Sequence, residues 1–92
     1  MAKFRIIVKQ TAKKDFADII KSGNKALIAK LETMLIELSE HPYSGTGKPE
    51  LLKYNLAGYW SRRINRKDRL IYEIIEEPDR LVVIVSALGH YE

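Results

Sequence analysis

The chain contains no cysteine and two histidines, His41 and His90. Without cysteine, disulfides and thiolate metal sites are excluded, which suits a reducing compartment. Two histidines without cysteine give none of the ligand spacings of a zinc site. The phosphate-binding motif GxxxxGK(S/T) and the dinucleotide-binding motif GxGxxG are missing as well. We therefore expect neither a bound metal nor a cofactor.

Long apolar runs are also missing. The longest wholly apolar stretches span a few residues, whereas a membrane helix needs about 20. The first ten residues, MAKFRIIVKQ, lack the apolar stretch and the small-residue cleavage site of a signal peptide. We expect a cytoplasmic protein with no membrane partner. The 92 residues suffice for a single domain, 1–92, with a modest core.

Positive charge is concentrated in the middle of the chain. Residues 41–72 contain two acids, Glu50 and Asp68, and seven basic residues: Lys48, Lys53, Arg62, Arg63, Arg66, Lys67 and Arg69. Residues 73–92 reverse this balance, with five acids against Arg80. A basic segment of this kind favours a polyanionic partner such as RNA or DNA. A solvated charged surface without such a partner is the alternative, and charge alone does not decide between them.

The first half of the chain predicts one strand and two helices. A β-rich run at 4–8 is followed by a helical stripe of Ala12, Phe16, Ile19 and Ile20, with Thr11 as the expected cap and Gly23 as the end. Asp15 is expected in or near the first turn of that helix, where the helix dipole favours an anion. A second helix is expected from Asn24 to the residues before Pro42, with the core stripe Leu27, Leu31, Met34, Leu35 and Leu38.

The second half predicts a loop and three strands. Residues 41–50 contain two prolines and two glycines, as is typical of a loop. Strand-like runs follow at 59–64, 69–75 and 81–87, and the last run is apolar enough to lie inside a sheet. The linkers 65–68 and 76–80 are short enough for hairpins. The order β-α-α-β-β-β predicts an α+β fold, with a helical hairpin packed on a mainly antiparallel sheet.

Metal-free cleavage of RNA requires few groups, and this chain contains them. The ribose 2′-hydroxyl is the nucleophile, so the protein supplies a base, an acid for the leaving 5′-oxygen and cations for the phosphorane charge. Glu50, Arg69 and the pair His90-Tyr91 are candidates for these roles. Taken singly, each has an ordinary explanation as a solvated loop carboxylate, a strand-surface charge or a frayed tail. Tyr59 and Trp60 fit packing better than base stacking.

The segment GTGKPELLKYNLAGYWSRRINRKDRLIYEI, residues 45–74, resembles the YoeB-like toxins of the RelE/ParE superfamily. That group is marked by the runs GxGKPExLK, NLxGxWSRRI and RLxY, and by a C-terminal HY, as in His90-Tyr91 here. The resemblance implies a microbial-RNase-like fold and a toxin of a type II toxin–antitoxin system. It also implies a ribosome-dependent, metal-independent endoribonuclease that cleaves mRNA.

The resemblance also assigns roles to individual residues. Glu50 matches the general base, Arg69 the arginine that stabilises the transition state, His90 the general acid, and Tyr91 an aromatic that orients the substrate. The residues expected to bind RNA are Lys48, Lys53, Arg62 and Arg63. The expected partners are mRNA in the ribosomal A site, the 70S ribosome and a cognate acidic YefM-like antitoxin. A homodimer is left open, because the sequence does not give the oligomeric state.

Two features depart from the family pattern, and two other functions remain as alternatives. Leu88 stands where many relatives carry a polar or basic residue, and the N-terminal helices are rich in lysine. A ParE-like toxin that inhibits gyrase by binding would share the fold but would be expected to lose Glu50, Arg69 and His90. A non-catalytic nucleic-acid-binding module is the other alternative, and mapping mRNA ends on translating ribosomes separates all three.

Overall fold

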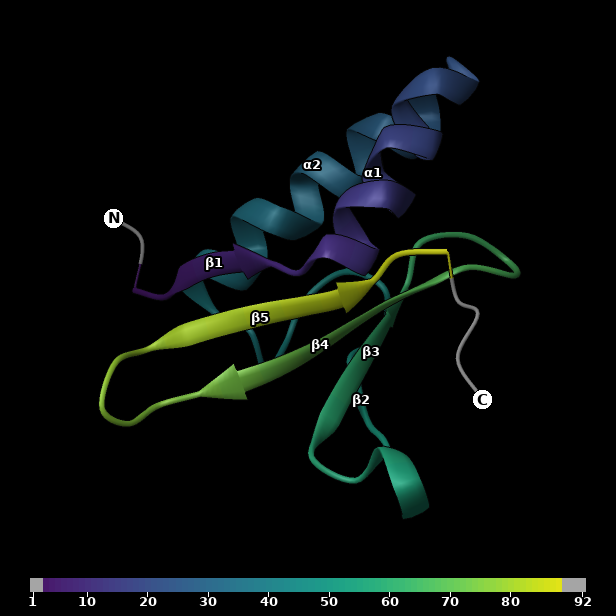
Figure 1. Ribbon diagram of the computed structural model, residues 1–92. Coiled ribbons are helices and arrows are strands. Elements are labelled where there is room, and N and C mark those ends of the chain that lie inside the picture. Colours follow the sequence, from purple (N-terminus) through teal and green to yellow (C-terminus); the bar gives the residue numbers. More distant parts are fainter. Residues whose placement is uncertain (1–2, 89–92) are drawn as a thin grey trace.

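A computed structural model describes residues 3–88. The first half of the chain contains β1 (Arg5–Val8), α1 (Gln10–Ser22) and α2 (Lys25–Glu40). The second half contains β2 (Glu50–Leu51), the 3₁₀ turn η1 (Tyr54–Leu56), β3 (Tyr59–Arg63), β4 (Arg69–Ile75) and β5 (Leu81–Ser86). Both helices lie on one side of a single sheet, so the predicted α+β fold is confirmed (Figure 1). Neither helix of this described part is long and apolar enough to cross a membrane.

The sheet has five strands in the order β1-β5-β4-β3-β2. The pairs β2–β3, β3–β4 and β4–β5 are antiparallel, as expected, and short turns at 64–68 and 76–80 join the last three strands. The pair β1–β5 is parallel, with Arg5 opposite Leu81. The apolar run at 81–87 therefore forms an interior strand, between β1 and β4. The two-residue strand β2 was not predicted, because its residues lack a strand-like pattern.

Local sequence signals explain where the helices end. Gly23 ends α1 in the left-handed conformation, with φ +70°, and its N–H donates to the carbonyl of Ile20. The side chain of Asn24 accepts a hydrogen bond from the N–H of Leu27 and so caps α2. At the other end, α2 stops at Glu40, two residues before Pro42, since the residue before a proline avoids helical geometry. All three signals were predicted correctly.

Three predictions about α1 were wrong. The helix begins at Gln10, and its N-cap Lys9 makes no side-chain cap. Thr11 is therefore inside the helix, and its hydroxyl donates to the carbonyl of Val85 in β5. Asp15 is not in the first turn, and its carboxylate accepts from backbone N–H groups at 87 and 88 instead. Ile20 is exposed, because its position on the helix turns it away from the sheet.

The core lies between the helices and one face of the sheet. From α1 and α2 it receives Ala12, Ile19, Leu31, Met34 and Leu38, which are buried, with Phe16, Leu27 and Leu35 packed beside them. From the sheet it receives the alternate residues Ile64, Leu70, Tyr72, Val82 and Ile84. Strand alternation places the residues between these on the opposite face, which neither α1 nor α2 covers. Burial of the apolar stripes is what holds both helices to the sheet.

Candidate functional site

The face of the sheet away from the helices carries three charged side chains at the β2–β3–β4 end. Glu50 in β2 pairs with Ser61 in β3, and Arg63, two residues further along β3, pairs with Arg69 in β4. Because residues i and i+2 share a face, Glu50, Arg63 and Arg69 lie on the same side. Oε1 of Glu50 and Nη1 of Arg69 are 3.5 Å apart. The structure thus brings together the expected base and the expected charge-stabilising arginine.

The electrostatics of this site favour an anionic ligand. Arg63 and Arg69 are directly opposite each other, and like charges in a cross-strand pair destabilise a sheet. The side chain of Glu50 is 65% exposed and that of Arg69 32%, so one carboxylate near the surface compensates only part of the charge. A phosphate group between the arginines would complete the compensation. Fold stability alone does not account for this pairing.

The expected lysines flank the short strand that carries Glu50. Lys48 and Lys53 are both exposed, one before β2 and the other after it. Lys48 has a backbone φ of +53° and Tyr54 one of +61°, which non-glycine residues seldom adopt. Such strain occurs preferentially at binding and catalytic sites. The loop, β2 and η1 therefore present cations on both sides of the carboxylate, and η1 projects away from the helices (Figure 1).

Arg62 does not belong to this exposed face, and its prediction as an RNA-binding residue was wrong. It is 0% exposed and points toward the helices, as strand alternation requires for a neighbour of Arg63. Its Nη1 lies 2.9 Å from Oε1 of Glu37 in α2, and its Nε donates to the hydroxyl of Tyr72 at 3.0 Å. Its remaining donors reach backbone carbonyls of the loop 41–47. The guanidinium therefore makes all of these hydrogen bonds within the protein, where RNA does not reach it.

The buried charge shifts two pKa values. Burial alone would raise the pKa of Glu37, but hydrogen bonds from Thr46 and from the Arg62 guanidinium outweigh it, so the pKa is lowered. Burial raises the pKa of Tyr72, and the hydrogen bond from Arg62 opposes this only in part. Glu37 is therefore ionised at neutral pH and Tyr72 is neutral. Sequence reasoning missed Glu37 entirely, since a glutamate on a helix is usually solvated.

Three further side chains, those of Tyr43, Trp60 and Ser86, lie outside this charged cluster. The rings of Trp60 and Tyr43 meet edge to face, with centroids 5.6 Å apart, and Trp60 packs against the core, as expected. Ser86 lies in β5 opposite Ile71, beside a register shift between Ile71 and Tyr72. Its hydroxyl is buried and has no hydrogen-bond partner within the described chain. A bulge of this kind next to a charged face is a feature that no sequence signal indicated.

The C-terminal candidates His90 and Tyr91 lie outside the described residues. The chain approaches them through Ala87 and Leu88, whose N–H groups donate to Oδ2 of Asp15 at 2.9 and 3.2 Å. The end of β5 is thereby tied to α1. Within residues 3–88 there is no group of three histidine, cysteine, aspartate or glutamate side chains that could hold a metal ion.

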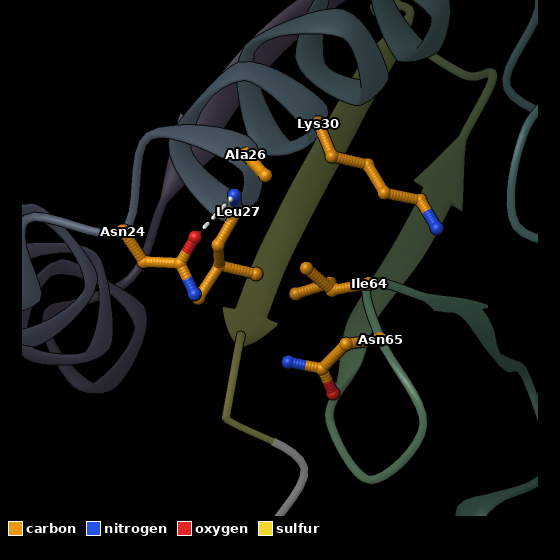
Figure 2. Close-up of a pocket in the computed structure, with 6 residues that line it drawn as sticks. All are labelled: Asn24, Ala26, Leu27, Lys30, Ile64 and Asn65. Carbon is orange, nitrogen blue, oxygen red and sulfur yellow. Dashed lines mark hydrogen bonds between the residues drawn. The ribbon is translucent and has the colours of Figure 1, made fainter.

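A separate small pocket lies between α2 and the turn after β3. It measures about 180 Å³, and Figure 2 shows its lining by Asn24, Ala26, Leu27, Lys30, Ile64 and Asn65. Lys30 is the one titratable side chain in that lining, so the pocket offers no acid–base pair. The exposed charged face is therefore the better candidate for chemistry. A carboxylate beside two arginines can accept a proton next to a phosphate and stabilise the charge that develops there.

The fold and this charged sheet face define a small α+β protein with a candidate site for an anionic ligand. The chain belongs to the YoeB-like toxins of bacterial type II toxin–antitoxin systems, whose family model matches residues 8–91. The YoeB toxin of Synechocystis sp. is 43% identical over 70 residues, which are 76% of this chain and 78% of that protein.

Solved structures from Staphylococcus aureus are similar as well. One is described as a YoeB dimer and another as a YoeB–YefM complex, with TM-scores of 0.79 and 0.78. Each is 34% identical and covers 98% of this chain and 100% of the other. The similarity thus extends beyond the signature motifs to the order and packing of the elements.

Proposed function

We propose that this toxin is a ribosome-dependent, metal-independent endoribonuclease that cleaves mRNA in the ribosomal A site. The observation that carries the proposal is the pairing of an exposed carboxylate, Glu50, with Arg69 on a sheet face that also bears Arg63. Membership of the YoeB-like family supports it, because the resemblance of residues 45–74 implies this activity. The side chain of Glu50 is 65% exposed, so a macromolecular substrate such as RNA can reach it.

The proposed reaction is attack of a ribose 2′-hydroxyl on the adjacent phosphorus. Glu50 takes the proton from that hydroxyl, the new O–P bond forms, and the bond from phosphorus to the 5′-oxygen breaks. His90 gives its proton to the departing 5′-oxygen, and Tyr91 orients the substrate; both roles come from the family resemblance. The products are a 2′,3′-cyclic phosphate and a 5′-hydroxyl.

The cationic side chains divide between charge stabilisation and binding. Arg69 stabilises the additional negative charge on the phosphorane oxygens, since it already lies within 3.5 Å of the base. Arg63, directly opposite, shares this role or holds the neighbouring phosphate. Lys48 and Lys53 hold the RNA backbone on either side of β2, where their ammonium groups are exposed.

The proposed protein partner is an acidic YefM-like antitoxin. The YoeB relative from Staphylococcus aureus was solved as a complex with YefM, and another structure of it is a dimer. The exposed basic residues of segment 41–72, among them Lys48, Lys53 and Arg63, offer a suitable surface for an acidic, disordered strand that folds on binding. An antitoxin bound to this surface would compete with RNA. For the toxin without its antitoxin, a homodimer is proposed.

The chemistry of the cut ends tests the proposed reaction. Ribosomes programmed with a defined mRNA are incubated with the purified toxin, and the ends of the fragments are mapped and identified. We expect a 5′-hydroxyl and a 2′,3′-cyclic or 3′-phosphate, and we expect cleavage to survive EDTA wherever the ribosomes stay intact.

A matched mRNA with one 2′-deoxyribose at the cut site is the control, because it lacks the nucleophile and differs in a single atom. It should resist cleavage at that position. Cleavage of this analogue, or fragments with 5′-phosphate ends, would overturn the mechanism. An intact mRNA together with arrested gyrase would favour the binding toxin instead.

A further inference from the structure

Arg62 makes an unusually complete set of contacts for a side chain in a strand. Its guanidinium reaches one carboxylate, one hydroxyl and four backbone carbonyls, with none of it exposed. The partners are Glu37, Tyr72 and the carbonyls of His41, Pro42, Ser44 and Thr46, at distances from 2.6 to 3.4 Å. Burying a charge costs free energy that hydrophobic packing would not incur. These contacts therefore have a role other than filling the core.

The carbonyls that Arg62 binds all belong to one segment, the loop 41–47. This loop has no helix or strand of its own, so its backbone oxygens find a partner in the guanidinium. Glu37 holds the same segment from α2, because its carboxylate accepts from the N–H and the hydroxyl of Thr46 at 2.8 and 2.7 Å. At Gly47, φ is +88°, and a Cβ atom would lie 2.7 Å from the carbonyl of Arg63. The loop is clamped tightly against α2 and β3.

The clamped loop leads directly into the strand that carries the proposed base. The carbonyl of Gly47 accepts from the N–H of Arg63 at 2.8 Å, and three residues later Glu50 begins β2. With two residues, β2 forms too few contacts of its own to fix a strand. The position of Glu50 relative to Arg69 is therefore set mainly by what precedes it.

We propose that Arg62, with Glu37 as its counter-ion, is a positioning residue that holds the loop 41–47 so that Glu50 faces Arg69. The proposal rests on the proposed function, in which Glu50 is the base. Arg62 acts only through the loop, since its guanidinium is enclosed and does not reach the substrate. Loss of the contacts between Arg62, Glu37 and the loop should shift Glu50 away from its position beside Arg69. A misplaced base slows the chemical step more than it weakens substrate binding.

The test uses variants that disturb the clamp from its exposed side. Glu37→Gln removes the counter-ion while keeping its shape, and Thr46→Val removes one hydroxyl donor from an exposed residue, so folding should survive. Thr46→Ser keeps that hydroxyl and is the conservative rescue. Tyr43→Phe is the loop control, because the Tyr43 hydroxyl donates to Glu76 outside the clamp. Ile19→Val is the control for a general loss of stability in the core.

Cleavage of ribosome-bound mRNA is measured under single-turnover conditions, well below each melting temperature. We expect Glu37→Gln to lower the maximal rate about a hundredfold, as a small misplacement of a reacting group does. We expect Thr46→Val to lower it about tenfold, the equivalent of one charge-assisted hydrogen bond. The toxin concentration that gives half of the maximal rate should stay unchanged in both variants. The variants Thr46→Ser, Tyr43→Phe and Ile19→Val should cleave like the parent.

Hydrogen exchange supplies a readout that does not depend on activity. The N–H of Leu52 donates to the carbonyl of Tyr59 at 2.9 Å beside β2, whereas that of Lys9 donates to Ile84 at 3.0 Å across the sheet. Exchange that accelerates by a larger factor at Leu52 than at Lys9 in Glu37→Gln would support the proposal, because a general loss of stability would speed both. An equal change in exchange at Leu52 and Lys9, or parental cleavage by Glu37→Gln, would overturn it. If the parent itself does not cleave, the proposed function fails, and exchange alone decides the role of Arg62.

Discussion

At the residue scale, Glu50 and Arg69 are exposed enough for their chemistry to be tested without disturbing the core. We expect Glu50→Gln to change the free energy of unfolding by about 0.5 kcal/mol or less. It should lower cleavage by about a hundredfold to ten-thousandfold, because it keeps the shape of the side chain but removes the base. Arg69→Ala should be at least as severe, since the transition-state charge is then left without its cation.

Thermal melts and cleavage on programmed ribosomes check this prediction on the same protein samples. Glu32→Gln is the matched control, because Glu32 is an exposed glutamate on α2, on a different element from the site. It should melt and cleave like the parent. Comparable cleavage by Glu50→Gln would mean that another group removes the proton.

Glu37 should make stability depend on pH in a defined direction. Its pKa in the folded protein lies below the ordinary value of 4.5, so the ionised form stabilises the fold. This contribution is present above the unfolded pKa and is lost as the pH falls through the folded pKa. We expect Glu37→Gln to destabilise the protein by about 1–3 kcal/mol at neutral pH, since Arg62 then loses its charged partner.

Urea unfolding of parent and variant at neutral pH and near pH 3 measures this difference. The gap between the two unfolding free energies should narrow on acidification, because protonation gives the parent a neutral Glu37 as well. A gap of constant size would show that the ionisation of Glu37 does not stabilise the fold.

At the element scale, Asp15 joins α1 to the end of β5. Its carboxylate accepts from the N–H groups of Ala87 and Leu88, and Thr11, one turn earlier, donates to Val85. We expect Asp15→Ala to destabilise the protein by about 1–3 kcal/mol, because two partly buried donors lose their acceptor. Asp15→Asn should cost less, since an amide oxygen remains.

Denaturant midpoints of the three proteins test this link. Asp18→Ala is the control, because Asp18 is an exposed aspartate on the same helix. Equal midpoints for Asp15→Ala and Asp18→Ala would contradict a stabilising role of the link.

The elements themselves were largely predictable from the sequence, and the exceptions have physical causes. Apolar spacing and the signals at Gly23, Asn24 and Pro42 located both helices, because these act within a few residues. The strand β2 depends on its pairing with β3, and the parallel pairing of β1 with β5 joins distant parts of the chain. Neither leaves a local pattern. Thr11 was misplaced because its hydroxyl binds β5 instead of its own helix.

The charged site was predictable in part. The family resemblance supplied Glu50, Arg63 and Arg69, which the structure places on one face. Arg62 was misassigned, because charge type alone favours exposure. A signal was present in the alternation of Trp60, Arg62 and Ile64, which puts all three on the core side of β3. Its partner Glu37 lies on another element, so only the folded structure could pair the two.

At the scale of the whole molecule, the proposed function predicts toxicity that a partner relieves. Expression of this chain alone should arrest bacterial growth, because every translating ribosome presents its substrate. Expression of an acidic YefM-like antitoxin with it should restore growth by covering the basic surface. The matched control is Glu50→Gln, which should bind the antitoxin and leave growth unaffected. Normal growth at high levels of soluble parent protein would contradict the proposal.

The parallel pairing of β1 with β5 also bears on when the sheet can form during synthesis of the chain. Translation delivers β1 among the first residues, yet its partner β5 emerges only after β4 has been made. Long-range pairing of this kind must wait for the later partner. A nascent chain therefore holds Glu50 and Arg69 without the completed sheet beneath them. The topology therefore makes completion of the sheet that carries Glu50 and Arg69 depend on β5, the last of its strands along the described residues.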